Sequence, residues 1–92
     1  MGIDIIDEFR KIFPEFLVED ISGGNKRYDR IWIHNKKPPI MEIWFIKQTA
    51  KFDVNVYNSW PEPIKPIPRS GIQVDLADPE CFEKIYNFFK ES

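Results

Sequence analysis

The 92 residues carry a net charge of −2, with 42% hydrophobic and 30% charged side chains, a composition that excludes a disordered chain and indicates a folded one. This length allows one hydrophobic core and excludes a large multidomain architecture. No apolar run approaches the roughly 18 residues of a membrane-spanning helix, so the sequence predicts none.

Cysteine usage and the start of the chain both predict a cytoplasmic protein. Cys81 is the only cysteine, so no internal disulfide can form, which fits a reducing compartment. The first eleven residues carry acidic side chains where a secretory signal needs a basic region. We therefore expect no secretion.

The first predicted element is a helix over residues 3–13. Its apolar side chains recur at helical spacing and form one stripe: Ile5, Ile6, Phe9, Ile12 and Phe13. Asp4 can cap the first turn, and Pro14 ends the helix. A short strand is expected next, over residues 16–21, closed by turn-forming residues.

Residues 28–34 and 40–48 predict an antiparallel hairpin, because both alternate in polarity and a short turn rich in Lys and Pro joins them. The second stretch is the most apolar of the chain and is the expected central strand. One of its faces carries Glu42, which would be costly to bury unpaired, so that face is expected to point away from the core. The other face is expected to point inward with Met41, Ile43 and Phe45.

Two registers of this hairpin place the outward side chains of both stretches on the same face of the sheet. One places Trp32 opposite Trp44. The other places Trp32 opposite Glu42 and Arg30 opposite Trp44. Both registers put the two tryptophans on the outward face, within reach of each other.

The second half of the chain predicts two more strands and a helix. The strands cover residues 52–57 and 72–76, and between them residues 59–69 contain four prolines and predict an extended crossover. Residues 78–80 (Asp-Pro-Glu) predict a helix start. The apolar stripe of this helix is Phe82, Ile85, Tyr86 and Phe89.

This element order predicts an α+β fold over residues 1–92 as a single domain. An antiparallel sheet of four or five strands is expected to be covered on one face by the N- and C-terminal helices, giving a two-layer sandwich. No predicted element covers the opposite face, although its side chains are unusually apolar for a solvated surface.

Two interpretations of that face remain open. In the first, residues 59–69 fold back across it through Trp60, Ile64 and Ile67, and its role is structural. In the second, it binds another protein, or a second copy of the chain as a homodimer, since Trp, Tyr and Arg are enriched at interface anchors. The partner-binding residues would then be Arg30, Trp32, His34, Trp44 and Tyr57. The second interpretation makes the protein a small intracellular binding module of the inhibitor, immunity or adaptor type.

The alternative function is binding of single-stranded nucleic acid by the basic-aromatic hairpin 26–51. Residues 21–51 hold seven basic and two acidic side chains, whereas both ends of the chain are acidic. The acidic balance of the whole chain argues against it, because affinity for phosphates grows with the number that a protein neutralises.

The sequence predicts no enzyme, no cofactor and no metal site. Asp29 and Glu42 resemble the acidic pair of metal-dependent nucleases, but they are expected on opposite faces, and Trp44 stands where such sites have a lysine. His34, the only histidine, has no acid or nucleophile at a spacing that indicates a catalytic site. Two acidic neighbours disfavour a reactive thiolate at Cys81.

Overall fold

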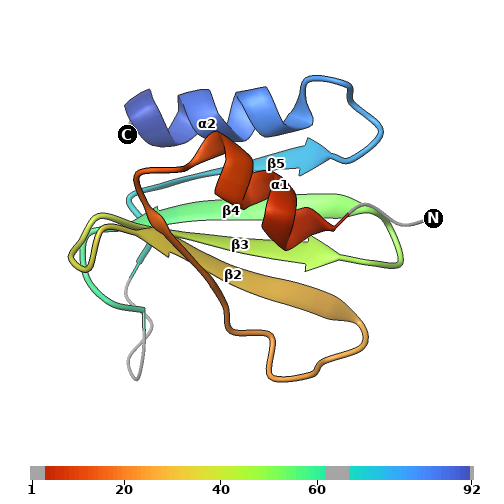
Figure 1. Cartoon of the computed structure of the whole chain (residues 1–92), viewed down its shortest axis with the longest axis horizontal. Helices are drawn as coiled ribbons and strands as arrows, with labels where there is room; N and C mark the ends of the chain where they lie inside the picture. Colours follow the sequence, from red (N-terminus) through yellow and green to blue (C-terminus); the bar gives the residue numbers. More distant parts are fainter. Residues whose placement is uncertain (1–3, 62–66, 92) are drawn as a thin grey trace.

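A computed structural model describes residues 4–61 and 67–91. Two helices and a five-stranded antiparallel sheet make up this part of the chain, so the predicted α+β fold is confirmed. The strands β1 (Leu17–Asp20), β2 (Tyr28–His34), β3 (Ile40–Ile46), β4 (Lys51–Tyr57) and β5 (Ser70–Asp75) lie in chain order across the sheet. The helices α1 (Ile5–Ile12) and α2 (Cys81–Glu91) lie together on one face (Figure 1).

Helix α1 begins and ends where its sequence signals stand. The Asp4 side chain accepts a hydrogen bond from the Asp7 backbone N–H at 3.2 Å, which satisfies one unpaired donor of the first turn. The last helical residue is Ile12, two positions before Pro14, so the helix is slightly shorter than the predicted 3–13. Residues 1–3 lie outside the described residues.

The β2–β3 hairpin adopts the second of the two predicted registers. Trp32 lies opposite Glu42, and Arg30 lies opposite Trp44. Strand β3 ends at Ile46, two residues before the predicted end, because the chain turns over residues 47–50 and Ala50 takes a positive φ of 54°. Strand β3 is the central strand of the sheet, as expected.

Helix α2 starts later than the predicted signal at residues 78–80. The Asp78 carboxylate accepts the Glu80 backbone N–H at 2.9 Å, and the Asp78 carbonyl accepts the Cys81 backbone N–H at 3.0 Å. These bonds form a turn, after which the helix runs from Cys81.

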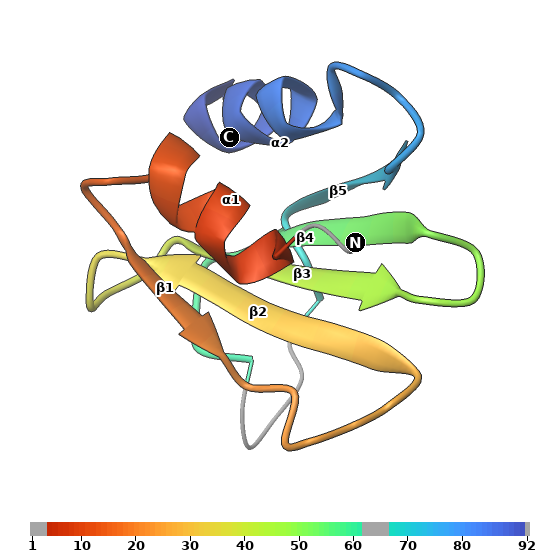
Figure 2. The ribbon, with the colours of Figure 1, turned by 45° about the vertical axis from the view of Figure 1, so that its right-hand side comes forward.

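Figure 2 shows the two helices over one face of the sheet. The hydrophobic core is made of side chains from the helices and from that face of the sheet. Met41, Ile43 and Phe45 of β3 are buried there, as predicted. Aromatic rings of the helices, and of Phe13 directly after α1, contact the sheet and each other. The Phe9 and Phe52 centroids are 5.8 Å apart, and the Phe13 and Phe89 centroids are 5.9 Å apart. Each fully buried side chain of this size stabilises the fold by about 1.5–3 kcal/mol relative to exposure, so this layer carries most of the stability.

The Pro-rich crossover is described at its two ends only. Trp60 and Pro61 follow β4, and Pro61 is fully buried. Arg69 donates its backbone N–H to the Val56 carbonyl at 2.7 Å just before β5 begins. Ile67 was expected to anchor the crossover on the sheet, but it is 92% exposed, so that prediction is wrong. Ile64 lies outside the described residues.

Candidate functional site

The candidate site lies on the outer face of the sheet, which we define as the face opposite the two helices. Strand β2 places Tyr28, Arg30, Trp32 and His34 there, because their side chains alternate with the buried Ile31 and Ile33. Strand β3 adds Ile40, Glu42, Trp44 and Ile46.

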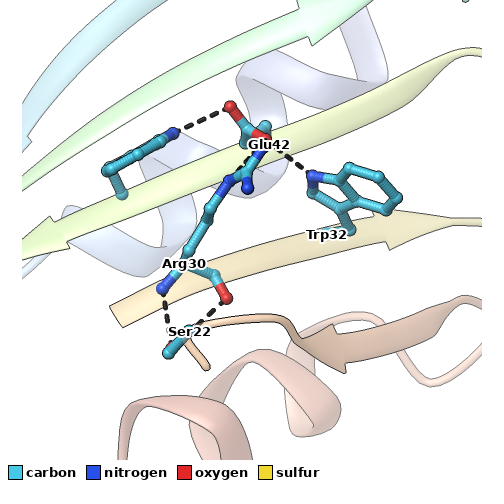
Figure 3. Close-up of polar contacts among 5 residues, drawn as sticks. Ser22, Arg30, Trp32 and Glu42 are labelled. Atoms are coloured by element: carbon cyan, nitrogen blue, oxygen red, sulfur yellow. Dashed lines mark hydrogen bonds and ion pairs between the residues drawn. The ribbon is translucent and has the colours of Figure 1, made fainter. Parts of the chain in front are cut away.

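The Glu42 carboxylate is the centre of this face. Its Oε2 accepts hydrogen bonds from Arg30 Nε at 3.0 Å, Arg30 Nη2 at 2.7 Å and Trp32 Nε1 at 2.7 Å. Its Oε1 accepts one from Trp44 Nε1 at 2.8 Å. Figure 3 shows Arg30, Trp32 and Glu42 turned toward one another across β2 and β3. These donors explain how a carboxylate in a residue only 3% exposed is accommodated, since an unpaired buried charge would be strongly destabilising.

Arg30 also packs between two indole rings. Its guanidinium carbon lies 5.2 Å from the Trp44 ring centroid and 5.8 Å from that of Trp32, both within the range of cation–π attraction. Tyr28 extends the stack, with its ring 4.5 Å from Trp44. The Ser22 hydroxyl accepts the Arg30 backbone N–H at 2.9 Å, which holds the strand at this point (Figure 3). We call Tyr28, Arg30, Trp32 and Trp44 the aromatic patch.

His34 lies at the other end of β2, beneath Trp60. Its Nδ1 accepts the Lys36 backbone N–H at 2.9 Å, so the proton of the neutral ring is on Nε2, which contacts the Glu19 carboxylate. The Trp60 ring lies 4.8 Å from His34 and 5.7 Å from Trp32. His34 is therefore only 3% exposed. The Trp60 ring thus covers His34 and also contacts Trp32.

Tyr57 closes the same end from β4, where it lies opposite Ile40. Burial raises the pKa of the Tyr57 phenol, and the Glu42 charge raises that pKa further, while Arg30 lowers it. The residue is 8% exposed, so Tyr57, like His34, lies under the surface.

The five partner-binding residues predicted from the sequence thus form one continuous region with two levels. Trp32, Trp44 and Arg30 are half-buried and reach the surface, whereas His34 and Tyr57 are buried beside them. Two contributors were missed: Glu42 as the shared acceptor and Tyr28 in the stack. Trp60 was expected as a cover in the structural interpretation of this face, and its ring does contact Trp32 and His34. The signal for Glu42 was available, because a lone acid in an apolar central strand needs nearby donors.

The opposite end of the hairpin carries a basic cavity of about 510 Å³. Tyr28 belongs both to this cavity and to the aromatic patch. Lys47, which lines the cavity, lies 3.7 Å from the Asp29 carboxylate. The cavity is lined by Lys26, Arg27, Tyr28, Ile46, Lys47 and Gln48.

The carboxylates Asp29 and Glu42 do not converge. Asp29 lies opposite Phe45 on the helix-covered side of the sheet, whereas Glu42 is on the outer face. Over residues 4–61 and 67–91, no three His, Cys, Asp or Glu side chains are grouped to hold a metal ion. Burial raises the pKa of the Cys81 thiol, which opposes thiolate formation.

Within the same described ranges, neither helix is long and apolar enough to cross a membrane. Comparison of the chain with models of protein families, with curated proteins and with solved structures found no match.

Proposed function

We propose that the protein is a small cytoplasmic protein-binding module, of the inhibitor, immunity or adaptor type, which binds its partner through the aromatic patch. The partner is another protein or a second copy of this chain. The patch combines large aromatic surfaces with a guanidinium, the residue types that most often dominate the energy of protein interfaces.

One observation carries the proposal: Trp32 and Trp44 are held through the same carboxylate and both retain exposed ring surface. Each indole N–H is bonded to Glu42, and Arg30 fills the space between the rings. Side chains that are already ordered lose little conformational entropy on binding, so more of the contact energy appears as affinity. A patch that was only structural would need cover, and among the described residues Trp60 supplies it at the His34 end.

The other half of the outer face has the character of an interface rim. Strands β4 and β5 place polar or charged side chains there, next to the aromatic half, in register with β3. A polar rim beside an apolar centre is the usual anatomy of a protein interface. The rim residues are Lys51, Asp53, Asn55, Gln73 and Asp75.

A binding comparison with three forms of the protein tests the proposal. The wild type, Trp44→Gln and Tyr86→Gln are immobilised in parallel and exposed to extract of the cells that make the protein. Gln at position 44 removes the ring and keeps an amide N–H donor for Glu42, while Tyr86 is a half-buried aromatic residue of α2 on the other side of the molecule.

The proposal predicts that a protein is retained by the wild type and by Tyr86→Gln and is lost with Trp44→Gln. Sedimentation of the same three forms up to millimolar concentration tests the second copy as partner. The proposal fails if no retained protein and no self-association depends on Trp44.

The second candidate is single-stranded nucleic-acid binding, favoured by the basic cavity that adjoins Tyr28 at the end of the hairpin. Fluorescence anisotropy with a labelled oligothymidine separates it from the first. Nucleic-acid binding predicts an affinity that falls steeply with salt and falls again in Lys26→Gln. A protein interface on the aromatic patch predicts no oligothymidine binding.

A further inference from the structure

A second concave site lies on the helix side of the molecule, where the turn between β2 and β3 meets the end of α2. This cavity has a volume of about 410 Å³, within the usual range for small-ligand sites. It shares no lining residue with the aromatic patch, so the inference drawn from it is independent of the proposed function.

The floor of this cavity is aromatic and fixed by the core. The Phe16 and Phe89 rings line it and lie 5.4 Å apart. Phe13, which is buried, contacts both, with ring centroids 5.9 Å from each. Pro38 and Pro39 of the turn form an apolar wall. The floor and wall present a largely apolar surface that does not need to rearrange to receive a ligand.

The polar groups of the cavity are cationic. Lys37 of the turn and Lys90 of the last turn of α2 line it, together with the Asn35 amide. None of the described lining residues carries a carboxylate. The Lys90 ammonium lies 5.6 Å from the Tyr86 ring centroid, at the side of the cavity, and Lys37 has no ion-pair partner among the described residues. The positive potential of the cavity is therefore uncompensated by its own lining.

A smaller cavity lies beside this one. The two share Phe16 and Lys90, and the smaller cavity has a volume of about 210 Å³. It is lined further by Ile12, Phe13, Pro14, Glu15 and Tyr86, so toward the α1 end the apolar side chains are joined by the carboxylate of Glu15.

We propose that this cavity binds a small organic carboxylate with an apolar body. The body would lie on Phe16 and Phe89, and the carboxylate would be bound by the ammonium groups of Lys37 and Lys90. Charge-assisted hydrogen bonds of this kind favour an anion over a neutral molecule of equal size. An inorganic anion would leave the aromatic floor unused, which is why an amphipathic acid is the class that fits.

Titration followed by two-dimensional amide NMR tests the proposal, with decanoate as an acyl-chain acid and 3-phenylpropionate as an aromatic acid. At least one acid is expected to shift the amides of Asn35, Lys37, Phe89 and Lys90, and to leave the indole signals of the outer face in place. The acid that binds more tightly identifies the source of the ligand. Decanol, which has the chain and no charge, is expected to bind at least about fivefold more weakly than decanoate if the acyl acid is the ligand.

Three variants assign the binding energy. Lys37→Gln and Lys90→Gln are each expected to weaken binding by about fivefold to tenfold, because each removes one charge-assisted contact. Lys36→Gln is the matched control, because Lys36 is exposed in the same turn and does not line the cavity. The affinity of this variant for the acid should stay within about twofold of the wild-type value.

The proposal is overturned by any of four results. These are no shifts with either acid, shifts confined to the outer face, equal affinity for decanol and both acids, or unchanged affinity in both cavity lysine variants. The amide spectra of the free variants show at once whether each is folded, and both lysines are exposed, so folding is not expected to obscure the result.

Discussion

Arg30 and Glu42 form an ion pair that joins β2 to β3 beneath the two tryptophans of the outer face. Arg30 Nη2 lies 2.7 Å from Glu42 Oε2, with side chains 15% and 4% exposed. In the sheet register Arg30 is opposite Trp44 and Glu42 is opposite Trp32, so the pair lies diagonally between the indoles. The ion pair therefore sets the positions of both rings of the proposed binding surface.

Replacing Glu42 by Gln is expected to lower the free energy of unfolding by about 3 kcal/mol, because the change removes the negative charge that Arg30 faces in a buried setting. Urea unfolding followed by tryptophan fluorescence measures the loss. Asp53→Asn is the control, since Asp53 is an exposed carboxylate of the same face and its loss should be within about 0.5 kcal/mol. Equal losses in the two variants would show that the Arg30–Glu42 ion pair contributes no more to stability than an exposed carboxylate does.

The indole N–H groups of Trp32 and Trp44 are expected to stabilise the fold independently of the contacts that their rings make. Trp32→Phe and Trp44→Phe each keep an aromatic ring and remove a donor to a buried carboxylate, so each should cost about 1–3 kcal/mol. Trp60→Phe should cost less than about 0.5 kcal/mol, because Phe retains the ring contacts with Trp32 and His34. A similar loss in all three variants would contradict the hydrogen-bonding role.

Alkaline pH is expected to destabilise the fold through Tyr57. Its folded-state pKa is raised above the ordinary value of 10.0, chiefly by burial and then by Glu42. The stabilisation is therefore complete below pH 10 and is lost as the pH rises through the folded-state pKa, since the unfolded chain ionises first. Unfolding measured from about pH 8 to about pH 11 should show a smaller alkaline loss in Tyr57→Phe than in the wild type. Parallel curves would contradict this.

Acidic pH is expected to destabilise the fold through Asp20. The Ser22 hydroxyl and backbone N–H hydrogen-bond to the Asp20 carboxylate and hold its pKa below the ordinary value of 3.8. The resulting stabilisation is present above pH 3.8 and is lost as the pH falls through the folded-state pKa. In Ser22→Ala the pKa of Asp20 should rise toward 3.8, as measured by NMR titration of its carboxyl carbon. An unchanged titration curve would exclude the Ser22 hydroxyl bond as a cause.

Local signals predicted most of the architecture. The Asp4 cap, the stop before Pro14 and the alternation of β2 and β3 depend on neighbours in the chain, and the structure confirms them. The choice between the two hairpin registers needed more. In the observed register, two side chains of β2, Arg30 and Trp32, donate hydrogen bonds to the buried Glu42. The alternation of polar and apolar residues does not by itself favour this register over the other.

The sequence indicated Trp60 as a cover of the outer face but not which side chains lie buried there, because that depends on contacts between distant segments. Trp60 covers His34 from the crossover after β4, and Glu19 contacts the same imidazole from β1. Alternation placed His34 and Tyr57 correctly on the outer face but did not indicate that both are buried there.

The most direct test of the proposed function is a two-dimensional amide NMR spectrum of the isotope-labelled protein in unlabelled, nuclease-treated extract of the cells that make it. We expect the indole signals of Trp32 and Trp44 to broaden or shift while the amides of α2 stay in place, because a protein partner would cover the outer face only. Indole signals that match those in buffer would contradict the proposal. Changes present only in extract that has not been treated with nuclease would also contradict it, and would assign the face to nucleic acid.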